Sequence, residues 1–196
     1  NNLDEGVGGP ASLIMDASGT AVASTATVSW ESNGTWASTG EGEENNTAPP
    51  GDDRNLMTGY LDTTDVSVTE VTVTGLDDVF SDGYNVAIYI QGGVNGRGGQ
   101  YTVTTDSLVT TLNLVQDNAF DGTYVPGGQA GANYLVMAGF TSPDFTITAT
   151  PTDGSPERAP INAIEIVHVF IPEPSSLVLM GLALVGFAGL SRRRRG

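Results

Sequence analysis

Residues 84–90 read Tyr-Asn-Val-Ala-Ile-Tyr-Ile and carry the clearest strand pattern in the chain. Val86, Ile88 and Ile90 alternate with the residues between them, so all three point to one face of an extended segment. Alternation with period two, built from β-branched side chains, is typical of a strand that packs one face on a core. This stretch therefore favours a β domain.

Similar patterns recur on both sides of these residues. Residues 25–30 alternate apolar and polar side chains, and in residues 145–150 apolar side chains alternate with threonine. Threonine and β-branched residues are enriched in strands, so both segments favour extended structure. Residues 25–30 belong to a longer predicted strand, 22–30. The other segments that we predict as strands are 13–16, 56–61, 66–76, 100–105, 108–115, 134–140 and 161–170, with a short additional strand at 124–125.

Residues 66–76 change face along their length. The two valines at the start of this segment and the two valines near its end fall on opposite faces of a regular strand. An extra residue or a bend in a strand produces such a shift, so we predict a bulge or bend near Thr69-Glu70. Polar and glycine-rich composition predicts surface loops over 40–53, 91–99 and 118–132.

About nine to eleven short strands without an internal helix predict an all-β fold. We interpret the pattern as a jelly-roll-like β-sandwich, since many short strands separated by turn residues are typical of sandwiches. No repeat of fixed period is present in the sequence, which argues against a propeller or a β-helix.

The C-terminal tail differs in kind from this domain. Residues 177–190 contain no charge, and as a helix these fourteen residues would span about 21 Å. The flanking serines extend the predicted transmembrane helix to 175–191, the lower limit of the length that crosses a bilayer. A block of basic residues follows: Arg192, Arg193, Arg194 and Arg195. The positive-inside bias predicts that this block stays cytoplasmic and that residues 1 to about 170 lie on the other side.

Pro172-Glu173-Pro174, the short apolar helix and the arginine cluster together resemble the PEP-CTERM sorting signal. The resemblance covers residues 171–196 and implies an exported protein of a Gram-negative, exopolysaccharide-producing bacterium. It also implies that Pro172, Glu173 and Pro174 are recognised by an exosortase, a transpeptidase-like membrane enzyme that removes the helix and the arginines. The family implies an N-terminal signal peptide as well, and none is visible after Asn1.

These observations predict three segments. Residues 1–11 are a flexible lead-in, residues 12–170 are an extracytoplasmic β-sandwich domain, and residues 171–196 are the sorting signal. Within this signal, the motif is 172–174, the transmembrane helix 175–191 and the arginine cluster 192–195. Before processing, the protein is anchored in the membrane with its C-terminus in the cytoplasm; afterwards it resides at the cell surface or in the extracellular matrix.

Residues 158–167, Arg-Ala-Pro-Ile-Asn-Ala-Ile-Glu-Ile-Val, resemble the closing strand of galactose-binding-like and malectin-like jelly rolls. The resemblance covers about ten residues. It implies that this strand packs centrally and that loops at one edge of the domain bind carbohydrate. Buried strands of this composition are common in any sandwich, and the rest of the chain contains no ligand motif of these families.

Charge excludes some partners. The segment before Pro172 contains 22 acidic residues against three arginines, a net charge near −19. Such a surface repels nucleic acid and anionic membrane surfaces, and it suits solubility outside the cell. The chain contains no cysteine, so disulfides contribute nothing to the fold.

No catalytic set is apparent in the sequence. His168 is the one histidine, and a lone histidine in a strand is more often structural than catalytic. A Ser-His-Asp triad would need it, and no Gly-x-Ser-x-Gly motif accompanies it. Paired carboxylates remain open, because many acidic residues can pair by chance. We therefore expect no enzymatic activity and no required cofactor.

Two kinds of binding site remain open. Calcium prefers oxygen ligands, and Asp77, Asp78 and Asp82 form a loop-borne cluster that would hold a structural calcium ion, although solvated acids are the plainer interpretation. Sugar rings stack on exposed aromatic side chains. Trp36, beside the Asn33-Gly34 turn, and Tyr124, in a glycine-rich loop, are the predicted carbohydrate-binding residues; core packing is the alternative for each.

Three functions follow from the sequence. The first is a structural or adhesive protein of the cell surface or biofilm matrix, which would contact extracellular polysaccharide. The second is a carbohydrate-binding module, stabilised by calcium in one version of this hypothesis. The third is a polysaccharide-active enzyme that uses a pair of carboxylates.

Overall fold

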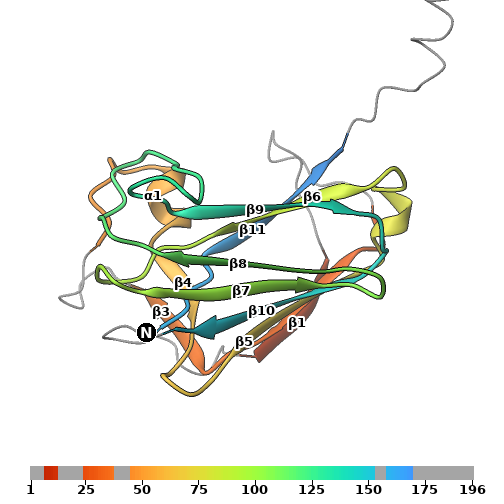
Figure 1. Ribbon diagram of the computed structural model, residues 1–196, viewed down its shortest axis with the longest axis horizontal. Helices are drawn as coiled ribbons and strands as arrows, with labels where there is room; N and C mark the ends of the chain where they lie inside the picture. The colour runs from red at the N-terminus through yellow and green to blue at the C-terminus, as the bar shows by residue number, and fades with distance from the viewer. Residues whose placement is uncertain (1–6, 13–23, 38–44, 153–157, 170–196) are drawn as a thin grey trace, which may run out of the picture.

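The computed structural model describes residues 7–12, 24–37, 45–152 and 158–169, and these form an all-β domain (Figure 1). The helix predicted over 175–191 lies outside the described residues. The strands of the domain are β1 (Val7–Ser12), β2 (Thr27–Glu31), β3 (Gly34–Ala37), β4 (Gly59–Asp62), β5 (Thr69–Thr74), β6 (Tyr84–Tyr89), β7 (Gly98–Thr104), β8 (Val109–Val115), β9 (Tyr134–Phe140), β10 (Phe145–Pro151) and β11 (Ala163–His168). The structure confirms the predicted all-β class.

The strands form three antiparallel sheets. The largest has the order β1-β2-β5-β10-β7-β8, the second β11-β6-β9, and the third β3-β4. Leu61 of β4 forms an antiparallel bridge with Ile161, two residues before β11, which connects the third sheet to the second. The second and third sheets together therefore line up as β3-β4-β11-β6-β9.

The pairing from β4 onward is nested. β7 pairs with β8, β6 with β9 and β5 with β10, while β4 bridges to the segment that leads into β11. The chain from β4 to β11 is therefore one long antiparallel hairpin folded over on itself. Its strands are divided between two sheets, β5-β10-β7-β8 and β4-β11-β6-β9.

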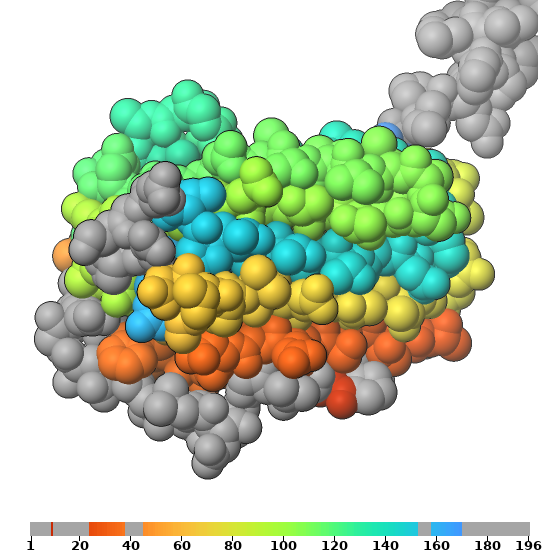
Figure 2. Space-filling model, turned by 60° about the horizontal axis from the view of Figure 1, so that its bottom comes forward, coloured from red at the N-terminus to blue at the C-terminus, as the bar shows by residue number. Residues whose placement is uncertain are grey.

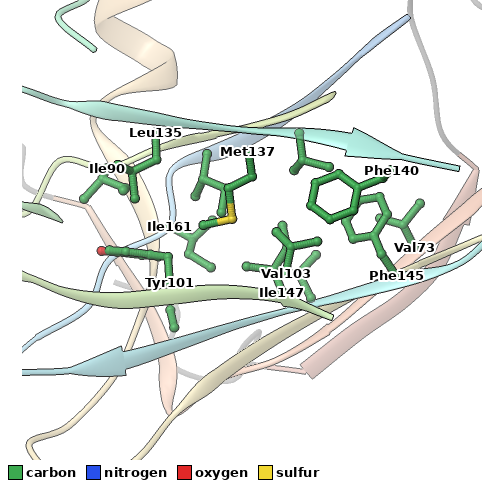
Figure 3. Close-up of a cluster of buried hydrophobic side chains, with 14 of the residues drawn as sticks. Val73, Ile90, Tyr101, Val103, Leu135, Met137, Phe140, Phe145, Ile147 and Ile161 are labelled. Carbon is green, nitrogen blue, oxygen red and sulfur yellow. The ribbon is translucent and has the colours of Figure 1, made fainter. Parts of the chain in front are cut away.

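The two sheets face each other across one core (Figure 3). Val103 and Ile147 contribute from the larger sheet, while Met137 and Phe140 contribute from the smaller one. Each of these side chains is at most 1% exposed. The predicted face of residues 84–90 is confirmed, because Val86, Ile88 and Ile90 are fully buried in this core.

The bulge predicted near Thr69-Glu70 is wrong. β5 begins at Thr69, and its pairing with β2 and β10 has a continuous register. Thr69, Val71 and Val73 face the core, with at most 4% of each residue exposed. The earlier valines lie before the strand, so the apparent change of face marks the strand boundary and not a bulge within it.

Two further predictions about the domain need correction. A five-residue helix, α1 (Asp52–Leu56), and a short 3-10 helix, η2 (Leu76–Asp78), interrupt the predicted all-strand pattern. Both are too short to show helical periodicity, so no pattern in the sequence indicated a helix there. β1 covers part of the predicted lead-in over 1–11, because its backbone pairs with β2.

The outer face of the six-stranded sheet is rich in hydroxyl groups. Figure 2 shows this face, with β7 and β8, then β10, β5 and β2 lying side by side. Thr72 and Thr146 approach within 3.2 Å through their Oγ1 atoms, and Thr102 and Thr111 within 3.0 Å. The predicted alternation of residues 145–150 is confirmed, since its threonines lie on this face while its apolar residues enter the core.

Candidate functional site

Loops from three parts of the sequence meet beside α1, at one end of the sandwich (Figure 1). These loops are residues 45–58, 90–97 and 116–133, and we name this region the loop end. The backbone amides of Thr47 and Ala48 both donate to the Phe120 carbonyl, at 2.7 and 3.1 Å. These bonds fasten the segment before α1 to the long loop between β8 and β9.

Four aromatic rings form a cluster at the loop end. The Tyr124 ring centroid lies 5.2 Å from that of Phe120 and 5.3 Å from that of Tyr89, and the Tyr89 ring stacks on Tyr134 at 5.7 Å. Phe120 is buried with Ala48 and Met57 in a small second core. The three tyrosines are half-buried, so their rings support the loops and still reach the surface.

Two carboxylates accept hydrogen bonds from this cluster. The Tyr124 hydroxyl donates to Asp53 Oδ1 at 3.0 Å, and the Tyr89 hydroxyl donates to Glu165 Oε2 at 2.7 Å. Burial, together with the bond to Asp53, raises the pKa of Tyr124 to about 12. Burial and the bond to Glu165 also raise the pKa of Tyr89. Both hydroxyls are therefore protonated donors at neutral pH.

A buried amide network lies under the same loops. Gln116 Oε1 accepts hydrogen bonds from Asn45 Nδ2 at 3.0 Å, from Gln91 Nε2 at 3.1 Å and from the Gly92 amide at 3.2 Å. Gln91 and Gln116 are each 1% exposed. These bonds set the positions of the loops relative to one another. No local pattern predicted the network, because the residues bonded to Gln116 lie 24 to 71 positions away from it.

The predicted carbohydrate-binding residues are both half-buried. Tyr124 belongs to the aromatic cluster, and its hydroxyl is engaged by Asp53. Trp36 lies in β3 opposite Tyr60 of β4, and its indole Nε1 is buried without a hydrogen-bond partner among the described residues. Neither ring is the exposed platform that we predicted; the Tyr124 ring packs against Phe120 and Tyr89.

The predicted calcium residues lie at the opposite end of the sandwich, around η2. Asp78 accepts hydrogen bonds from the Thr25 amide at 2.9 Å, the Thr25 hydroxyl at 3.1 Å and the Ser24 hydroxyl at 3.3 Å. These bonds lower the pKa of Asp78, and they fasten the start of β2 to η2. Within the described residues, no group of three histidine, cysteine or acidic side chains is arranged to hold a metal ion. Asp77, Asp78 and Asp82 therefore do not converge on a common point.

His168 occupies the last position of β11. It is half-buried, and its ring centroid lies 6.0 Å from that of Phe80. This packing gives the side chain a structural environment near η2, away from the loop end.

The predicted sorting tail, including Pro172, Glu173, Pro174 and the arginine cluster 192–195, lies outside the described residues. Among the described residues, no helix has the length and apolar character needed to cross a membrane.

Comparison with known proteins identifies the tail. Residues 170–195 match the family model of the PEP-CTERM protein-sorting motif. A tail of this kind implies an exported protein that is sorted through its C-terminus. In particular, the chain carries the PEP-CTERM motif, which implies processing by an exosortase and anchoring through the tail before cleavage. The predicted resemblance of residues 171–196 to the PEP-CTERM sorting signal is confirmed. No curated protein and no solved structure matched the chain in the searches.

Proposed function

We propose that the protein is a structural or adhesive component of the cell surface or extracellular matrix, without catalytic activity. The observation that carries this proposal is the sorting motif at residues 170–195, joined to an all-β domain. A secretion signal would bring the domain out of the cell, the tail would hold it in the membrane, and the exosortase would then release it from this temporary anchor. A compact, acidic domain retained outside the cell suits contact with extracellular polysaccharide.

The nested strand pairing supports the jelly-roll interpretation of the domain. A jelly roll has eight strands in two sheets, and a long hairpin folded over on itself produces this arrangement. β4 to β11 supply eight strands with such pairing, and β1, β2 and β3 extend the sheet edges. The domain is thus a rigid unit whose loops are displayed at its two ends.

The experiment follows the full chain, carrying a secretion signal, in an exosortase-bearing host and in the same host without exosortase. The proposal predicts cleavage of the tail and retention of the domain at the cell surface or in the matrix in the first host alone. The triple substitution Pro172→Ala, Glu173→Ala, Pro174→Ala should leave the tail uncut. Release of all processed protein into the medium would argue against a surface or matrix role.

A carbohydrate-binding module is the second candidate, and the aromatic cluster at the loop end favours it. Half-buried tyrosines beside Asp53 and Glu165 supply ring faces and hydrogen-bond acceptors, the two features that sugar sites combine. This candidate predicts binding in a glycan array that weakens in Tyr124→Ala and Trp36→Ala, with circular dichroism showing that each variant is folded at the assay temperature. Tyr124→Phe, which keeps the ring, is the matched control.

Calcium stabilisation is a separate part of this second candidate. It predicts that the melting temperature rises with added calcium and falls again with a chelator. A melting temperature unchanged by calcium and by the chelator would exclude calcium stabilisation but would not affect the hypothesis of carbohydrate binding.

The absence of catalysis is also open to experiment. Hydrolysis of a polysaccharide by the purified protein would contradict the proposal and favour the third candidate, a polysaccharide-active enzyme. Loss of that activity on substitution of two carboxylates, with an unchanged melting temperature, would identify its acid and base.

A further inference from the structure

β8 is an edge strand with one open side. It pairs along its whole length with β7, from Val109 opposite Thr104 to Val115 opposite Gly98. Among the described strands, none pairs with its other side, and β9, at the corresponding edge of the facing sheet, belongs to a different hydrogen-bonded ladder (Figure 1). An unpaired strand edge is a template for pairing with another strand.

The flanking hydrogen bonds determine which backbone groups of β8 are open. The Gln116 amide donates to the Arg97 carbonyl, and the Thr105 amide donates to the Leu108 carbonyl. Hydrogen-bonded pairs alternate along an antiparallel ladder, so the even-numbered residues of β8 bond to β7. The N–H and C=O groups of the remaining residues point to the open edge. These residues are Val109, Thr111, Asn113 and Val115.

β8 lacks the features that normally protect an edge. Its sequence, Val-Thr-Thr-Leu-Asn-Leu-Val, contains no charge and no proline, and its register with β7 has no bulge. Val109 is 63% exposed, Leu112 37% and Val115 49%. Natural edge strands are usually blunted by lysine, proline or bulges. An uncharged, apolar edge is unexpected on a domain with a net charge near −19.

The strand is also self-complementary about Leu112. In this pairing, β8 of a second copy of the chain lies antiparallel along the open edge, and Leu112 of one copy lies opposite Leu112 of the other. Val109 then meets Val115, and Thr111 meets Asn113, so the four residues with open backbone groups pair like with like; the remaining pair, Thr110 with Leu114, joins a polar and an apolar side chain. In this register the open N–H and C=O groups of one strand face those of the other, as an antiparallel ladder requires. The pattern therefore fits a second copy of the same strand.

We propose that β8 is a self-association edge, at which two copies of this chain pair antiparallel about a two-fold axis at Leu112. The contact is isologous, because the same patch serves both copies. One strand from each copy makes a small interface, so the dimer is weak and depends on concentration. Asp106 and Asp117 flank the strand and come close to each other between copies, so salt strengthens the association. This inference does not depend on the sorting of the tail.

Engineered cysteines test the geometry directly, since the chain contains no cysteine of its own. In the proposed dimer, Leu112→Cys faces its own copy at a Cα separation of about 4.5 Å, within the range that a disulfide spans. Val109→Cys faces position 115 of the other copy and lies about 20 Å from its own counterpart. Val66→Cys, at an 88% exposed position outside the strands, is the control for random collision.

The experiment oxidises each full-length variant with diamide and measures the covalent dimer on non-reducing gels, after circular dichroism has shown that it is folded. We expect Leu112→Cys to cross-link several-fold more than Val66→Cys, and more at 0.5 M than at 0.05 M salt. Val109→Cys and Val115→Cys should each fail alone and cross-link when mixed. Equal cross-linking at all positions, none at Leu112→Cys, or a cross-link only to another protein would overturn the proposal.

Discussion

The backbones of Leu61 and Ile161 exchange two hydrogen bonds, of 2.9 and 3.2 Å, across a separation of 100 residues in the chain. This bridge connects β4 to the segment that leads into β11, and so brings the two ends of the folded hairpin together. Ile161 is 3% exposed and packs in the main core. Closure of the sandwich therefore depends on a contact between the beginning and the end of the eight-strand unit.

Ile161→Ala tests this closure. Removal of a buried isoleucine side chain costs about 2–5 kcal/mol of unfolding free energy, because the transfer energy is lost and a cavity remains. The matched control is Val167→Ala on β11, at a residue that is 43% exposed, which should change stability by less than about 0.5 kcal/mol. Urea denaturation measures both variants. Equal effects would show that Ile161 does not belong to the core.

The ion pair beside this bridge should stabilise the domain. Arg158 Nη1 lies 2.9 Å from Asp62 Oδ2 and also donates to the Thr63 carbonyl. Asp62 is mostly buried, with 11% of its side chain exposed, so loss of the Arg158 guanidinium removes a positive charge that compensates a poorly solvated carboxylate. We expect Arg158→Gln to cost about 1–3 kcal/mol in urea denaturation. A double-mutant cycle with Asp62→Asn that gave no coupling would contradict this assignment.

Asp78 should make the stability of the domain depend on pH in the acidic range. Its pKa is lowered from the ordinary 3.8, with the bond from the Thr25 amide as the largest cause. The resulting stabilisation is fully present above pH 3.8 and is lost as the pH falls through the lower folded-state value. Asp78→Asn keeps a hydrogen-bond acceptor but has no charge to titrate. Its melting temperature should therefore fall less than that of the wild type between pH 4 and pH 2, and parallel curves would refute the assignment.

Tyr124 should make the stability of the domain fall as the pH rises in the alkaline range. Its pKa rises from 10 to about 12, mainly through burial. A neutral hydroxyl favoured in the fold stabilises fully below pH 10, and this contribution is lost as the pH rises through about 12. Tyr124→Phe removes the titration, so its stability should fall less than that of the wild type across this interval. The tyrosinate absorbance of Tyr124→Phe should also show one titrating group fewer near pH 12 than that of the wild type. An unchanged titration in this range would contradict the raised pKa of Tyr124.

Local patterns in the sequence predicted most of the strands. Val86, Ile88 and Ile90 face the core as their alternation requires, and the predicted strands 100–105 and 108–115 correspond to β7 and β8. The sorting tail was also predictable, since its recognition elements are contiguous. These features depend on neighbouring residues, which a single sequence displays directly.

Long-range contacts were not predictable in the same way. The bridge of Leu61 to Ile161 and the bond of Tyr89 to Glu165 join residues 100 and 76 positions apart, and neither pair has a local signature. The half-buried position of Tyr124 depends on α1, a helix too short to show periodicity. The surroundings of the candidate site therefore follow from how the loops meet, which no single segment determines.

The most direct test of the sorting account is the mass of the mature C-terminus. The chain is isolated from the surface of an exosortase-bearing host and digested, and its C-terminal peptide is measured by mass spectrometry. We predict an end at or near Pro172-Glu173-Pro174, with the apolar segment and the arginines absent. Recovery of peptides that include residues 177–196 from surface-exposed protein would contradict the central claim.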